Sequence, residues 1–204
     1  METKKPQFNR ILLIILIVLF VITNGAFNYA NWAADPESMD WWMMLLNFLI
    51  LSIPLVLLYG SIYVLVIAWR EHSTLGYVNP RLAKVIHWAP RIAAILIIFF
   101  LSLFSLDVFE MEASPLELLG GFLIHNIPSI VMIVLLVFAW KQPVVGFVAF
   151  ITVAILLTIL FVRSIDSIPN MLLFTFPILL IAFLFYADWR WLKPQPLAQI
   201  DEAA

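Results

Sequence analysis

Long runs of apolar residues, separated by short polar segments, dominate the chain. A helix needs about 20 apolar residues to cross the hydrocarbon core of a bilayer. Segments of this kind occupy residues 11–29, 42–68, 92–109, 116–140, 144–162 and 171–186. The strands of a membrane barrel would instead alternate apolar and polar residues over about ten positions, and the sequence lacks such segments. The pattern therefore predicts an all-α fold, a bundle of six transmembrane helices.

The composition supports membrane residence and excludes several kinds of chemistry. Of the 204 residues, 64% are hydrophobic and 12% are charged, whereas a soluble domain is roughly half apolar and a quarter charged. The net charge of −2 gives no electrostatic argument for a nucleic-acid partner. Because cysteine is absent, disulfides, thiolate catalysis and iron–sulfur ligation are excluded. We expect no cofactor.

The basic residues predict the orientation of the six spans. Cytoplasmic loops of membrane proteins collect Lys and Arg. With the N terminus inside, ten of the eleven basic residues fall on the cytoplasmic side, and only Arg163 falls outside. The ten are Lys4, Lys5, Arg10, Arg70, Arg81, Lys84, Arg91, Lys141, Arg190 and Lys193. We therefore predict a multi-pass protein of the inner (plasma) membrane, with both termini in the cytoplasm.

The segment 70–91 is the longest cytoplasmic connection and divides the chain. It separates an N-terminal hairpin (1–69) from a four-helix unit with a short cytoplasmic tail (92–204). Asn79-Pro80 is typical of a helix start, and Pro90 ends or kinks the helix that follows. We predict either a short interfacial helix or an ordinary positively charged loop. Its membrane-surface residues would be Arg81, Lys84, His87 and Arg91.

Two alternatives concern the organisation of the chain. Lys4-Lys5 followed by an apolar run is also compatible with a cleaved secretory signal, although Asn24 and Asn28 fit poorly before the cleavage points near residues 26 and 30. Three hairpins each return inward to a Trp directly followed by a basic residue, which is compatible with a parallel repeat. Their unequal Pro-to-Trp spacings favour simple interfacial anchoring instead.

Two ionisable residues fall within the predicted spans and are candidates for function. His125 lies 16 residues before Lys141, and Asp107 lies 16 residues after Arg91. Both would therefore lie about 24 Å above the cytoplasmic boundary, given the 1.5 Å rise of a helix. An imidazole beside a carboxylate would suit a proton relay or a general base. The alternative is that Asp107 ends its helix at the headgroups while His125 bonds a neighbouring group.

Polar residues gather in the outer half of the predicted bundle, and the inner half is almost entirely apolar. Asn126 and Ser129 join Asp107 and His125 at the outer level, so these four are the candidate ligand-binding residues. A conducting path would need polar lining through both leaflets. The asymmetry indicates an outward-facing polar pocket, or polar groups that merely bond helices together. We expect no metal site, because the three His residues fall on opposite sides of the membrane.

The segment Ser102-Leu103-Phe104-Ser105-Leu106-Asp107-Val108-Phe109, together with His125, Pro128 and Ala139-Trp140-Lys141, carries a family resemblance. Over residues 91–190 the chain resembles uncharacterised small multi-pass membrane proteins of bacteria and archaea. The resemblance implies a common fold but no established activity, and it indicates Asp107 and His125 as positions to test.

The sequence leaves three hypotheses for function. The leading one is a non-enzymatic accessory or structural subunit, which would pack beside a membrane-protein partner or form a homo-oligomer in the lipid bilayer. The second is a binder or transporter of a lipid or small amphiphile, with a pocket around Asp107 and His125. The third is a membrane enzyme in which His125 is the base and Asp107 orients it.

Overall fold

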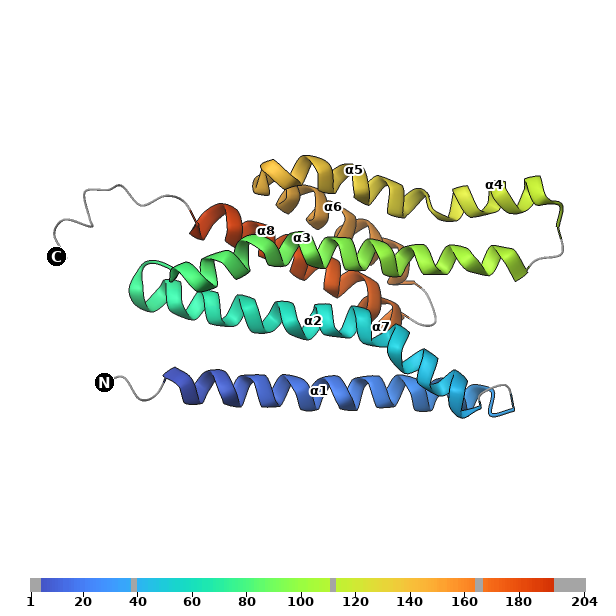
Figure 1. The fold of residues 1–204 in the computed structure, drawn as a ribbon, viewed down its shortest axis with the longest axis horizontal. Helices are drawn as coiled ribbons and strands as arrows, with labels where there is room; N and C mark the ends of the chain where they lie inside the picture. The colour runs from blue at the N-terminus through green and yellow to red at the C-terminus, as the bar shows by residue number, and fades with distance from the viewer. Residues whose placement is uncertain (1–4, 38–39, 111–112, 164–166, 193–204) are drawn as a thin grey trace.

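The computed structural model describes residues 5–37, 40–110, 113–163 and 167–192. Lys4 and Lys193, which entered the sequence analysis, lie outside these residues. In the described part the fold is all-α, as predicted, and its helices run roughly parallel or antiparallel along one long axis (Figure 1). Helix α1 begins and helix α8 ends at the same end of the bundle (Figure 1). We call this the terminal end and the other the distal end.

Among the described residues, five continuous helical segments are long and apolar enough to cross a membrane. A sixth span exists if a pair of helices bent by 45° is counted as one. The helices are α1 (Lys5–Ala34), α2 (Trp41–Leu75), α3 (Pro80–Leu103), the bent pair α4 (Pro115–His125) and α5 (Ile127–Lys141), α6 (Pro143–Phe161) and α8 (Phe176–Trp191). Short elements complete the described chain: η1 (Phe104–Glu110), α7 (Ser167–Asn170) and η2 (Met171–Thr175).

The connection between α2 and α3 is shorter than the sequence indicated. Helix α2 continues to Leu75 and ends on Gly76, whose φ of 76° is the left-handed conformation that glycine adopts readily. Asn79 caps the next helix, because its side-chain oxygen accepts hydrogen bonds from the backbone N–H groups of Arg81 and Leu82, each at 3.0 Å. Helix α3 then runs without interruption past Pro90 into the third span.

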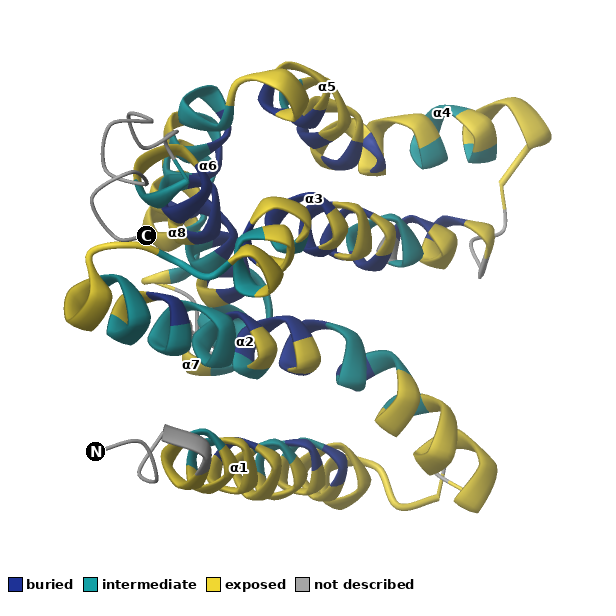
Figure 2. Ribbon diagram, turned by 60° about the vertical axis from the view of Figure 1, so that its left-hand side comes forward, coloured by how far each residue is buried: buried dark blue, intermediate teal, exposed yellow. Residues whose placement is uncertain are grey.

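Helix α8 lies at the centre of the packing, in contact with α2, α3 and α6. Its side chains Ile178 and Phe185 are fully buried, together with Ile97 of α3 and Phe150 of α6. Gly146 allows α6 to approach closely, since a Cβ atom built there would lie 2.7 Å from the ring of Phe185. Figure 2 shows the buried residues concentrated on the facing sides of these helices.

Helix α1 is peripheral and packs mainly against α2. Its surface is largely exposed (Figure 2), with Ile14 at 60% and Ile22 at 61%. Apolar side chains exposed over a helix of this length require lipid or another apolar surface around them. Toward the distal end, buried polar contacts hold α1 on α2. The Nδ2 group of Asn24 donates to the carbonyl oxygen of Phe48 at 3.2 Å and to the hydroxyl of Ser52 at 3.0 Å.

Candidate functional site

Three irregular helical segments lie in the distal half of the bundle. The third span ends in the 3₁₀ segment η1, and α4 and α5 meet in a 45° bend at Asn126. Pro128 contributes to this bend because it has no N–H to continue the helical bonds. The sixth span contains the π segment η2, in which the N–H of Phe176 bonds the carbonyl of Met171. Irregular helices within spans are common at binding sites, because they free backbone groups and redirect side chains.

A groove of about 400 Å³ lies beside these irregular segments. We call it the distal groove. Its walls come from α3, from the α4–α5 bend, from α6 and from η2. The lining residues are Leu101, His125, Pro128, Ser129, Val131, Met132, Val153, Leu157, Leu160, Phe161 and Phe174. Their apolar character and the volume are typical of sites for small organic ligands, which occupy about 300–1,000 Å³.

Two polar side chains interrupt the apolar wall of the distal groove. Ser129 is 2% exposed, and its hydroxyl has no hydrogen-bond partner among the described residues. An unpaired buried hydroxyl is costly, which favours a partner supplied from outside the protein. The Nδ1 atom of His125 donates a hydrogen bond to the carbonyl of Gly121 at 2.9 Å. In the neutral ring, Nε2 is then left as an acceptor. The groove therefore offers a hydroxyl and an imidazole nitrogen to a polar head.

The other two candidate ligand residues lie elsewhere. Asn126 is buried at the bend, where its Nδ2 group donates to the hydroxyl of Ser105 at 2.6 Å and to the carbonyl of Phe122 at 3.0 Å. It thus ties the bend to η1. Asp107 is exposed on η1, and no hydrogen bond or ion pair within the described ranges joins it to His125. The carboxylate–imidazole pair considered from the sequence is not formed in this structure.

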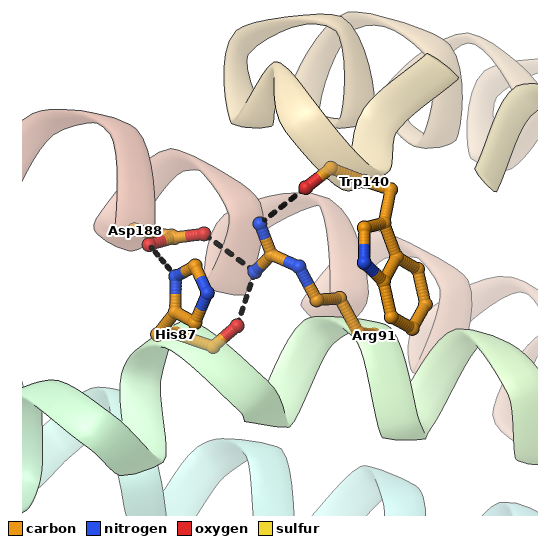
Figure 3. A network of polar contacts seen from close by, with 4 residues as sticks. All are labelled: His87, Arg91, Trp140 and Asp188. Carbon is orange, nitrogen blue, oxygen red and sulfur yellow. Dashed lines mark hydrogen bonds and ion pairs between the residues drawn. The ribbon is translucent and has the colours of Figure 1, made fainter. Parts of the chain in front are cut away.

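A buried charged network lies at the terminal end (Figure 3). Arg91 of α3 is 1% exposed, and its NH1 atom lies 2.7 Å from Oδ2 of Asp188 on α8. The same guanidinium donates to the carbonyl of Trp140 at 2.9 Å and to the carbonyl of His87. The ring of His87 contacts Oδ1 of Asp188 at 3.2 Å. The network joins α3, α5 and α8 through one guanidinium, so its evident role is to fix three spans relative to one another.

The network also shows where the four candidate membrane-surface residues lie. Arg81 and Lys84 are exposed on the first turns of α3. The side chain of His87 is 48% exposed and reaches the buried carboxylate from the rim, while Arg91 lies inside the bundle. Helical spacing could have grouped His87 with Arg91, which are four residues apart. The sequence analysis missed Asp188. Its signal was a carboxylate at the end of the sixth span that lies level with Arg91 of the third span.

The fold defines the class of this molecule: a multi-pass membrane protein whose long helices expose apolar side chains. The chain belongs to the family described as Domain of unknown function (DUF7670), whose model matches residues 79–197, more than half of the chain. This confirms the resemblance to a family of unknown function, over a longer segment than 91–190. The match begins at the residue that caps α3 and leaves α1 and α2 outside. Comparisons with curated proteins and with solved structures each found no match.

Proposed function

We propose that the protein binds a single-chain amphiphile with an oxygen-bearing head, such as a fatty acid, in the distal groove. The observation that carries this proposal is the buried hydroxyl of Ser129, unpaired within the described residues, in the wall of an apolar groove of about 400 Å³. An acyl chain would lie against the apolar wall. Its head would accept from the Ser129 hydroxyl and, if protonated, donate to Nε2 of His125.

The positions of the irregular segments support this proposal. Leu101 lies in the last turn of α3 before η1, Phe174 belongs to η2, and His125 is the last residue of α4. All three line the same groove. Three departures from regular helix thus border one groove, and irregular helices within spans are common at binding sites.

Photo-crosslinking with a diazirine-bearing palmitic acid tests the proposal. In the purified protein we expect saturable labelling of groove peptides that unlabelled palmitic acid suppresses. Val153→Trp should abolish the labelling, because Val153 lines the groove. Ile155→Trp is the matched control, since Ile155 is 54% exposed on the same helix and does not line the groove. Ser129→Ala should weaken binding about fivefold, the loss of one neutral hydrogen bond of about 1 kcal/mol. Equal labelling of the two Trp variants would refute the proposal.

The accessory-subunit hypothesis has one specific support, the exposed face of α1. That helix packs mainly against α2 and would present side chains such as Ile14 and Ile22 to a partner. Lipid satisfies the same surface, so we rank this function second. Copurification in mild detergent should return a stoichiometric partner or a homo-oligomer, and a lone monomer would count against it. We do not propose the enzyme, because its required His125–Asp107 pair is not formed.

We also propose that the protein lies in the plasma (inner) membrane, with both termini in the cytoplasm. The support for this orientation is the distribution of positive charge: Arg10, Arg70, Arg81 and Lys141 all lie on helix ends or turns at the terminal end of the bundle. The terminal end then faces the cytoplasm, and the distal groove lies in the outer half of the membrane.

A further inference from the structure

A second groove, independent of the distal one, runs between α1 and α2. At the terminal end a polar pocket of about 120 Å³ is lined by Asn9, Ile67, Arg70, Glu71, Thr74 and Asn79. Deeper in the bundle an apolar pocket of about 220 Å³ is lined by Leu13, Leu16, Ile17, Phe20, Val56, Tyr59, Gly60 and Tyr63. We call the two together the hairpin groove.

The two pockets share one face of each helix. On α1 the lining positions follow one another at intervals of one to four residues from Asn9 to Phe20, and on α2 they do so from Val56 to Thr74. Spacing of three and four residues marks a single helix face. The two pockets therefore follow each other along one side of the hairpin, polar at the terminal end and apolar deeper in the bundle, which is the order of groups in a phospholipid.

The mouth carries a positive charge without a carboxylate partner. The guanidinium of Arg70 lies 4.2 Å from the ring centroid of Phe8, and within the described part of the chain it makes no ion pair. Glu71 also lines the mouth and keeps its negative charge, because its partner is a neutral amide. Nδ2 of Asn79 donates to both carboxylate oxygens at 2.7 Å, so these oxygens are turned to Asn79 and not to Arg70. Asn9 adds an amide whose side chain has no partner among the described residues. The N–H donors of Arg70 and Asn9 can therefore bind a phosphate group, which pairs with arginine through charge-assisted hydrogen bonds.

The depth of the groove matches one leaflet. The α2 face from Ile67 to Val56 extends about 16 Å at the helical rise of 1.5 Å per residue, and half of the hydrocarbon core is about 15 Å. Trp69, 62% exposed next to Arg70, is typical of the headgroup level. Tyr59 closes the far end, where its hydroxyl lies 2.8 Å from that of Thr23 on α1.

We propose that the hairpin groove binds one anionic phospholipid of the leaflet at the terminal end. Its phosphate contacts Arg70 and Asn9, and one acyl chain lies between α1 and α2 as far as Tyr59. The space beside Gly60, where an added Cβ would meet no atom within 4 Å, accommodates the chain. The bound lipid fills the hairpin groove in the terminal half of this interface, while the hydrogen bonds of Asn24 join the two helices in the distal half.

Native mass spectrometry of the full chain released from nanodiscs tests this proposal. The nanodiscs contain equal amounts of dioleoyl-phosphatidylglycerol and dioleoyl-phosphatidylcholine. We expect one retained phosphatidylglycerol per chain. Arg70→Gln should lower its apparent affinity about tenfold or more, the loss of a charge-assisted hydrogen bond. Arg81→Gln, an exposed arginine at the same end of the bundle, is the control and should leave retention unchanged.

The apolar part of the groove is tested separately. Gly60→Phe should reduce retention of phosphatidylglycerol by filling the groove, whereas Gly60→Ala should not. Soluble glycerol phosphate distinguishes a lipid from a free phosphate and should fail to displace the lipid. The proposal is overturned by equal retention of the two lipids, by equal effects of the two arginine variants, or by displacement with glycerol phosphate. Val153→Trp in the distal groove should leave retention unchanged, so this result and the test of the proposed function are independent.

Discussion

Removal of the carboxylate of Asp188 tests the central role of the buried network. In Asp188→Leu, Arg91 keeps its hydrogen bonds to the carbonyls of Trp140 and His87 but loses its only counter-charge among the described residues. Breaking a buried pair by removing one partner costs about 3–5 kcal/mol. The retained carbonyl contacts favour the lower end, so we expect a loss of about 3 kcal/mol, or roughly a 100-fold change in the unfolding equilibrium constant.

The assay is equilibrium unfolding in mixed dodecylmaltoside and SDS micelles, followed by tryptophan fluorescence and far-UV circular dichroism. The double variant Arg91→Met/Asp188→Leu removes both charges and should regain stability to within about 1 kcal/mol of the unmodified protein, since apolar replacements of a buried pair are often neutral. Arg81→Met on the exposed side of α3 is the control and should change stability by less than about 0.5 kcal/mol.

Two results would refute this reasoning. If Asp188→Leu unfolds at the same SDS fraction as the unmodified protein, the carboxylate does not stabilise the packing of α3 on α8. If the double variant is as unstable as the single one, the loss comes from the shape of the site and not from an uncompensated charge. A double-mutant cycle with Arg91→Met alone separates the pairwise term from both single effects.

Three further predictions test other parts of the structure. Gly146→Ala should lower stability by about 1 kcal/mol or more in the same SDS titration, because the new Cβ meets the buried ring of Phe185. The control Gly120→Ala should be neutral or stabilising, since its Cβ has no atom within 4 Å. Equal losses in the two variants would contradict the close approach of α6 to α8. Asn24→Ala removes two hydrogen bonds between α1 and α2, which are worth about 1–2 kcal/mol together for hydrogen bonds between membrane helices. Hydrogen–deuterium exchange should therefore rise in α1 and not in α8. Unchanged exchange in α1 would show that these bonds do not hold the hairpin together. Because the chain has no cysteine, the single variants Glu37→Cys and Tyr77→Cys can report the orientation in the membrane. An impermeant maleimide should label Glu37→Cys in intact cells and Tyr77→Cys only after permeabilisation. The reverse result would invert the proposed topology.

The positions of the polar residues along the chain indicated the level of the distal site but not its composition. Rise per residue predicted one level for His125 and Ser129, and both line the distal groove. The same calculation predicted that Asp107 lies at the same height along the bundle axis. Height along the axis does not say which side of its helix a residue occupies. The direction of a side chain around its helix depends on how the span is rotated and where it becomes irregular. The 3₁₀ segment at Phe104–Glu110 redirects the side chain of Asp107, and the bend at Asn126 redirects that of His125. The two side chains therefore do not meet.

The sequence by itself determined the all-helical, multi-pass character of this protein, because a backbone in hydrocarbon must satisfy its hydrogen bonds internally. It also predicted six spans, since their length follows from bilayer thickness; the described residues contain five candidate spans, or six if the bent pair α4–α5 counts as one. Only the tertiary structure decided that Arg91 is buried against Asp188, that the third span begins as early as Pro80, and that two grooves of different character exist. Those features depend on which helix faces meet, and lipid-exposed and buried faces are equally apolar, so hydrophobic patterning cannot distinguish them.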